Sequence, residues 1–281
     1  MPLQVPTAAS KWDHNFLGSI GMAFRRIDLF DQFFDIDPPM QFGVGLDQHL
    51  EAYVHTNVQR VRQIGLRNVN RLTDTRNTMP FQHDVLNFFQ AENNVMTYYP
   101  AEESAVDEFA KAVLNLLGFN LAPNINVHGP AAMSTSVGGT AVSAIPGIVV
   151  TNRSQEIVVL IVQEDKSLLS NVPRQNAIAQ LMAEALAAFT HDNLEAGYQQ
   201  QTVYGILLRG TVPLFFKIPM TIENVSRIQR ADQAINDLLI EGQYYCPHND
   251  MNEVGYLRTA DEHLLEFFQC FEAMRRMAIH E

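Results

Sequence analysis

The most constraining feature of the chain is an unbroken apolar run that ends in charged residues. Residues 157–162 read Ile-Val-Val-Leu-Ile-Val, and the next four residues are Gln163, Glu164, Asp165 and Lys166. The run is short and rich in β-branched side chains, which favours a strand covered on both faces over a buried helix. We therefore expect three ionisable groups at the end of a buried strand, with Glu164 and Lys166 on one face and Asp165 on the other.

A carboxylate beside a lysine at a strand end suits hydrolysis of phosphate esters. The carboxylate binds a divalent cation, and the ammonium group orients an attacking water or stabilises charge that develops on the phosphoryl group. The competing interpretation is a strand end where Glu164 and Lys166 pair with each other or reach solvent, as most charged side chains do. Two observations favour the functional interpretation: the run is too apolar for an edge strand, and lysine occurs only at positions 11, 111, 166 and 217.

Composition limits the class of protein. At 281 residues, with 47% hydrophobic and 18% charged residues, the chain can build one large domain or one domain with an appendage. Its net charge of −12 disfavours nucleic-acid partners, which need a basic face, although a local basic pocket is compatible with that charge. Cys246 and Cys270 are too few for a disulfide framework, and no signal-sequence pattern opens the chain, so we expect an intracellular protein. No run is long enough to cross a membrane.

The N-terminal part differs from the rest of the chain. Residues 1–45, the N-terminal arm, contain several prolines but too many phenylalanines for a solvated tail. The arm either wraps its own domain or packs on a neighbouring subunit in a homo-oligomer. A helical pattern follows over residues 46–64, and a stripe of arginines at positions 60, 62, 67 and 71 either faces solvent and pairs with carboxylates or binds phosphate. We therefore expect an arm and helical extension at residues 1–95 and a core domain at residues 96–281.

The core domain shows alternating helix and strand patterns. Helical patterns cover residues 104–117, 176–189 and 262–277, and strand patterns cover residues 124–128, 142–150, 157–162, 204–209 and 213–219. The tight loop at residues 151–154 makes the strand before it antiparallel to the central strand. The predicted fold class is α/β (α+β), with a mixed central sheet flanked by helices.

Further acidic and amide side chains lie near this sheet. Gln180 and Glu184 are four residues apart in the helix that follows the charged strand end, so they share one face. Asp107 and Glu108 lie at the border of the apolar stripe of an earlier helix, so one of these two carboxylates can face the sheet. Phosphate-binding glycine loops, nucleophile elbows and zinc-ligand spacings do not occur in the sequence.

The order of these elements resembles the PD-(D/E)XK nuclease-like fold, which is also called restriction-endonuclease-like. Four segments are similar, in order and spacing, to those of a large group of uncharacterised basidiomycete fungal proteins that carry a Gln-Glu-Asp-Lys strand. These segments are Val162–Lys166, Gln180–Phe189, Phe216–Thr221 and Cys270–Arg275. The likeness covers about residues 98–277, so most of the N-terminal extension lies outside it.

The resemblance implies phosphodiester hydrolysis with Mg²⁺ or Mn²⁺. It makes Glu164 the metal-binding carboxylate, Lys166 the catalytic lysine and Gln180 the glutamine that supports the site. It also implies an acid on the first helix, which is Glu108 or Asp107 in this chain. Further candidate metal ligands are Asp165 and Glu184.

The chain departs from the family pattern at Pro146-Gly147, where the resemblance implies Pro-Asp. The principal metal-bridging carboxylate is therefore missing, and one carboxylate with backbone oxygens and waters is a poor site for a hard divalent cation. Either Asp107, Glu108 or Glu184 replaces the missing acid, or the metal is lost and the fold serves binding or assembly. We expect a nuclease-like protein with a degenerate site that is weak or silent in hydrolysis.

Overall fold

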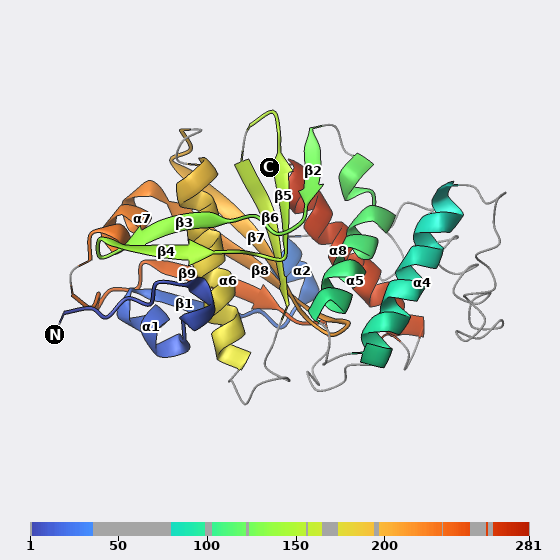
Figure 1. Ribbon diagram of the computed structural model, residues 1–281, viewed down its shortest axis with the longest axis horizontal. Coiled ribbons are helices and arrows are strands. Elements are labelled where there is room, and N and C mark those ends of the chain that lie inside the picture. The colour runs from blue at the N-terminus through green and yellow to red at the C-terminus, as the bar shows by residue number, and fades with distance from the viewer. Residues whose placement is uncertain are drawn as a thin grey trace.

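The chain folds around one mixed sheet with helices on both faces (Figure 1). The computed structural model describes residues 2–35, 80–98, 103–121, 124–155, 157–164, 174–193, 197–231, 233–247, 257 and 261–280. The predicted class, a mixed central sheet flanked by helices, is confirmed. The helical pattern at residues 46–64 and its arginine stripe lie outside the described residues.

The main sheet has seven strands in the order β1-β9-β8-β7-β6-β5-β2. Their bounds are β1 (Met22–Arg26), β2 (Ile125–His128), β5 (Ile148–Asn152), β6 (Ile157–Glu164), β7 (Gln200–Arg209), β8 (Val212–Thr221) and β9 (Ile240–Tyr245). The pairs β6–β7 and β1–β9 are parallel, and the other neighbouring pairs are antiparallel. A separate hairpin consists of β3 (Met133–Val137) and β4 (Thr140–Ala144).

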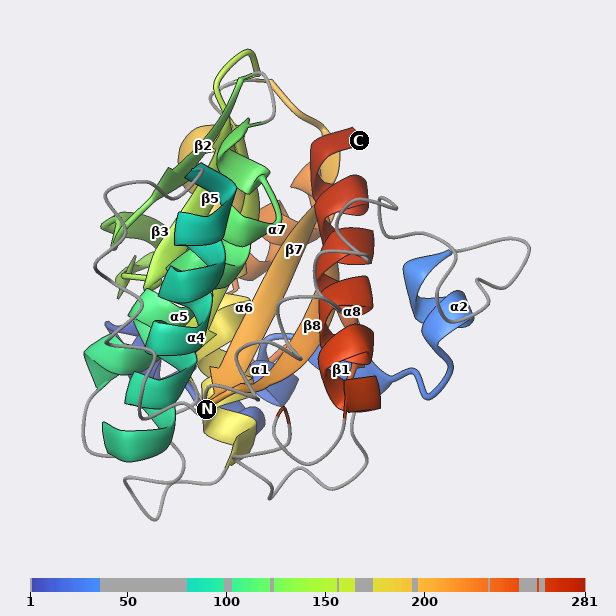
Figure 2. The ribbon, with the colours of Figure 1, turned by 90° about the vertical axis from the view of Figure 1, so that its right-hand side faces the viewer.

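Helices cover the sheet on both sides. The helical segments are η1 (Ala9–Lys11), α1 (His14–Ser19), α2 (Phe30–Phe34), α4 (Pro80–Tyr98), α5 (Glu103–Leu116), η3 (Phe119–Leu121), α6 (Arg174–Ala188), η5 (Phe189–Asn193), α7 (Ile222–Gln229) and α8 (Asp261–His280). Helices α2, α4, α5 and α8 share one apolar core, whereas η1, α1, α6 and the β3–β4 hairpin build the core on the opposite face (Figure 2). None of the helices in the described ranges combines the length and the apolar character of a membrane span.

Strand β6 is the covered central strand that its composition predicts. It lies between β5 and β7, and every side chain from Ile157 to Gln163 is buried. A β-bulge interrupts it, because Val150 of β5 pairs with Leu160 whereas Thr151 pairs with Val158. The extra residue, Val159, packs in the same core as Leu160. The bulge thus changes which residues face α5 along the strand, and a regular alternation from residue 157 does not describe it.

The predicted elements of the core domain are present, with three additions. The expected helices correspond to α5, α6 and α8, and the expected strands to β2, β5, β6, β7 and β8. The pattern at residues 142–150, which we interpreted as one interrupted strand, contains the end of β4 and the start of β5, which belong to different sheets. A two-glycine turn at Gly138 and Gly139, both with positive φ, joins β3 to β4. The sequence patterns missed β3, β9 and α7.

The described part of the N-terminal arm wraps its own domain. Strand β1 pairs with β9 at the edge of the main sheet. Trp12, Leu17 and Ile20 are at most 1% exposed and pack in the core with α6, while Phe33 is buried in the core on the opposite face. Residues 2–35 therefore belong to the same sheet and cores as the predicted core domain. A homo-oligomer that forms through residues 1–45 stays a prediction. The apolar side chains that are buried in the chain's own cores do not support it, because a neighbouring subunit is not needed to cover them.

Glu266 on α8 couples the stability of this fold to pH. Its Oε1 accepts a hydrogen bond from the Tyr245 hydroxyl at 3.4 Å. Burial raises the pKa of the Glu266 carboxyl above its ordinary value, while His263 and the Tyr245 hydrogen bond act in the opposite direction and do not cancel it. The folded protein thus holds this proton more tightly than the unfolded chain. Stability contributed by the group is present at low pH and is lost as pH rises through the raised pKa.

We expect Glu266→Gln to raise the melting temperature near neutral pH. The amide keeps an acceptor for Tyr245 and removes the half-buried charge, so the gain should shrink as pH falls and vanish below 4.5, the ordinary pKa of the group. Thermal melts across this pH range measure the effect. The exposed Glu108→Gln is the control and should show no such gain. A lower melting temperature for Glu266→Gln at neutral pH would contradict the assignment.

Candidate active site

The predicted site lies where β6 ends. Glu164 is the last residue of β6, and its backbone pairs in register with Leu208 of β7. The side chain of Glu164, together with Asp165 and Lys166, lies outside the described residues. The placement of residue 164 at the end of a covered strand is therefore confirmed for the backbone, and the roles of Glu164, Asp165 and Lys166 stay predictions.

The Pro146-Gly147 turn lies beside this strand end. Ile148, the first residue of β5, pairs with Val162, and the Gly147 amide donates a hydrogen bond to Gln163 Oε1 at 3.3 Å. Gly147 therefore lies next to the end of β6. Gln163 is 6% exposed and links the turn to the strand end, a contact that the sequence analysis did not predict. The signal available in the sequence is an amide at the end of an apolar strand, where burial requires it to have a partner.

Asp107 of α5 occupies the space beside Gly147. A Cβ atom placed on Gly147 would lie 2.6 Å from Asp107 Oδ1, 3.3 Å from Cγ and 3.4 Å from Oδ2. The first of these distances is shorter than real Cβ contacts allow, so a side chain at position 147 requires the Asp107 carboxylate to move. Helix α5 therefore presents a carboxylate at the place where a side chain of residue 147 would begin.

Glu108 does not join Asp107 at this place. Helix α5 turns Val106, Phe109 and Ala110 into the core, and this orientation leaves the Asp107 side chain half-buried and the Glu108 side chain exposed. The two neighbouring acids, which the sequence did not distinguish, thus have different surroundings. Of the two, Asp107 is the one that contacts the turn next to β6.

Gln180 and Glu184 form the predicted pair on α6. Gln180 Nε2 donates a hydrogen bond to Glu184 Oε1 at 2.9 Å, and Glu184 is fully buried. Their neighbours on α6 pack in the core on the face of the sheet opposite α5. The structure thus brings Gln180 to Glu184 and Asp107 to Gly147, on opposite faces. A site that used both pairs would have to form around the end of β6.

A metal at this end of the sheet needs more than the described side chains. In the described ranges, no three His, Cys, Asp or Glu side chains lie close enough together to hold a metal ion. A cation beside Asp107 would therefore depend on carboxylates from residues 164–165 as well. This donor set consists of carboxylate oxygens, which Mg²⁺ and Mn²⁺ prefer.

Neither a protein-family model nor a curated protein matches this chain. The functional argument consequently rests on the chain's own residues and on the geometry described above.

Proposed function

We propose that this chain is a PD-(D/E)XK nuclease-like domain with a degenerate Mg²⁺ or Mn²⁺ site, and that its phosphodiester hydrolysis is weak or silent. The order of elements supports the proposal. Helix α5 precedes the antiparallel strands β2, β5 and β6, helix α6 follows the predicted charged strand end, and β7 returns parallel to β6. This is the order that the sequence resemblance implies, and it places Pro146-Gly147 beside the strand that ends at Glu164.

The contact between Asp107 and Gly147 is the observation that carries the proposal. The strand has lost the carboxylate that the Pro-Asp pattern supplies, but a carboxylate from α5 lies against the same backbone position. A cation would then be held by Asp107 and Glu164, with Lys166 positioned to orient water. Because this acid comes from a helix rather than from the sheet, we expect the cation to bind less tightly than at a complete site.

The test removes the carboxylate of Asp107 from helix α5 and introduces a carboxylate at position 147, where the resemblance implies one. We expect Asp107→Ala combined with Gly147→Asp to bind Mn²⁺ at least about tenfold more tightly than the parent chain, a gain of about 1.4 kcal/mol. Removing Asp107 makes room for the new side chain, and the sheet holds the new carboxylate next to β6. Calorimetric titration with Mn²⁺ measures the binding, and cleavage of a labelled oligonucleotide measures the activity.

Matched variants control this experiment. Asp107→Ala with Gly147→Asn has nearly the same shape without the charge, so it should not gain Mn²⁺ affinity. Gly147→Asp alone forces the Asp107 carboxylate aside, and we expect it to lower the free energy of unfolding by about 1–3 kcal/mol. Adding Glu164→Gln should remove the gain. Equal Mn²⁺ binding by the Asp and Asn versions, or fast cleavage by the parent, would contradict the proposal.

The alternative is a non-catalytic assembly or binding protein that uses the N-terminal arm. Its motivation was the large number of apolar side chains in residues 1–45. In residues 2–35 most of these side chains are buried in the chain's own cores. The observations therefore favour the nuclease-like proposal over this alternative.

A further inference from the structure

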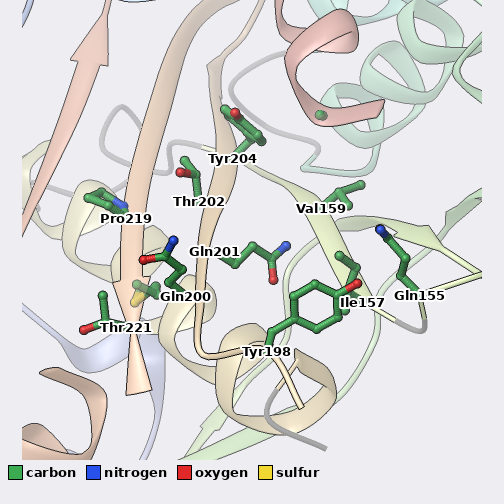
Figure 3. Close-up of a pocket in the computed structure, with 12 residues that line it drawn as sticks. Gln155, Ile157, Val159, Tyr198, Gln200, Gln201, Thr202, Tyr204, Pro219 and Thr221 are labelled. Atoms are coloured by element: carbon green, nitrogen blue, oxygen red, sulfur yellow. The ribbon is translucent and has the colours of Figure 1, made fainter. Parts of the chain in front are cut away.

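A pocket of about 440 Å³ lies at the opposite end of the central strands from Glu164. It is formed by the starts of β6 and β7, the end of β8 and the last turn of α8 (Figure 3). Val159 lines it, and Glu164 lies five positions further along β6, which corresponds to about 16 Å. The volume is in the range of small-molecule sites, and the position makes this pocket distinct from the proposed metal site.

The residues that line the pocket in the described part of the chain carry no charge. Apolar side chains, including Ile157 and Val159, form part of the wall, and amide and hydroxyl side chains form most of the rest. The whole chain has a net charge of −12. A phosphate or carboxylate ligand would therefore lose its hydration without gaining a cationic partner, and the field of the protein would repel it. The lining favours a neutral ligand.

Several hydrogen-bonding groups of the pocket are available. The side chains of Tyr198, Gln200 and Thr202 line it and make no hydrogen bonds with the described part of the chain. Each offers a hydroxyl or an amide, which both donate and accept hydrogen bonds. A ligand with several polar groups of its own would satisfy them.

Other polar side chains of the pocket are already oriented. Gln201 Nε2 donates a hydrogen bond to the Val158 carbonyl oxygen at 2.9 Å, and Gln155 Oε1 accepts one from Asn152 Nδ2 at 2.9 Å. Figure 3 shows the Tyr198 ring near both of these amides. Amides held in this way lose little conformational entropy on binding, so they favour a ligand of defined shape.

We propose that this pocket binds a neutral, ring-shaped ligand that carries several hydroxyl or amide groups, as sugars and nucleosides do. The apolar wall and the half-buried Tyr198 ring contact the faces of the ligand ring, and the amides and hydroxyls bind its polar edge. This binding is independent of the proposed metal site.

Two pairs of probes test the chemistry of the ligand. Adenosine is compared with adenosine 5′-monophosphate, and N-acetylglucosamine with its 6-phosphate, by calorimetry or ligand-detected NMR at millimolar concentrations. We expect one neutral compound to bind and its phosphorylated partner to bind at least about tenfold more weakly, because the described lining residues offer no cation. Which neutral compound binds distinguishes the nucleoside from the sugar. Absence of binding by both, or equal binding of a phosphorylated partner, would overturn the proposal.

Conservative variants test the location. Tyr198→Phe and Thr202→Val each remove one hydroxyl with little change of shape, and each should weaken binding of the neutral compound by about three- to tenfold. Gln90→Ala, an exposed change on α4, which contributes none of the described lining residues, is the control and should bind as the parent does. Melting curves establish that the variants fold. Unchanged affinity in both Tyr198→Phe and Thr202→Val would place the ligand elsewhere and overturn the assignment.

Discussion

Trp12→Ala is expected to lower the free energy of unfolding by about 3–5 kcal/mol. The Trp12 side chain is 1% exposed and packs edge-on against Phe16, with ring centroids 4.8 Å apart. It also lies in the core that α6 shares with the sheet. Removing it opens a large cavity beneath α6 that the surrounding helices cannot fill. Chemical denaturation of the parent and the variant measures the loss.

Trp12→Phe is the matched control. The smaller ring keeps much of the contact with Phe16, and it removes an indole N–H that is buried without a hydrogen-bond acceptor in the described part of the chain. These effects oppose each other, so we expect a loss below about 1.5 kcal/mol. A change of less than about 0.5 kcal/mol in Trp12→Ala, typical of surface positions, would contradict the burial of the arm.

The same variant separates the two interpretations of the arm. If residues 2–35 pack on their own domain, the destabilisation by Trp12→Ala does not depend on protein concentration. If the arm packs on a neighbouring subunit, the destabilisation depends on concentration, because association is then part of folding. Repeating the denaturation over a hundredfold range of concentration distinguishes these cases, and we expect no dependence.

Phe267→Ala is expected to have a similarly large effect, about 3–5 kcal/mol. Phe267 of α8 is fully buried and contacts Phe88 of α4, Phe109 of α5 and Phe271 of α8. Its ring therefore joins three helices on one face of the sheet. Phe267→Leu is the control, and we expect it to lose less than about 1.5 kcal/mol because it keeps most of the apolar volume.

This second prediction also bears on the proposed site. Helix α5 holds Asp107 against Gly147, and Phe109 on the same helix packs on Phe267. If Phe267→Ala remains folded, we expect weaker Mn²⁺ binding than in Phe267→Leu, because the position of Asp107 is less well defined. Equal stability of the alanine and leucine variants would contradict the central role of this ring.

Local sequence patterns were sufficient to predict the central strand and the helices that flank the sheet. Strand β6 has the short β-branched run of a buried strand, and α5 ends at Leu116, close to the predicted helix end at residue 117. Strands β1 and β9 were missed for a physical reason. β1 ends in two arginines, and β9 begins Ile-Glu-Gly-Gln. Edge and near-edge strands need less burial, so their composition is closer to that of loops.

In the candidate site, too, the sequence predicted some contacts and only the structure decided others. The spacing of Gln180 and Glu184 placed both on one helical face, and the structure joins them by a hydrogen bond. The choice between Asp107 and Glu108 could not be made from spacing, because the two residues flank the same stripe. It depends on how α5 is rotated against β6, and the packing of its apolar residues on the sheet decides this rotation.

The sequence by itself determines local features of this protein. It predicts which segments are strands or helices, and it places Glu164, Asp165 and Lys166 at the end of a strand that is buried on both faces. The tertiary structure alone places Asp107 against Gly147, pairs β1 with β9 at the edge of the main sheet, and assembles a pocket with uncharged described lining residues from the ends of β6, β7, β8 and α8. The physical reason is that periodicity reports which face of a segment is buried. Contacts between distant segments depend on register, bulges and helix rotation, which the packing of the whole core sets.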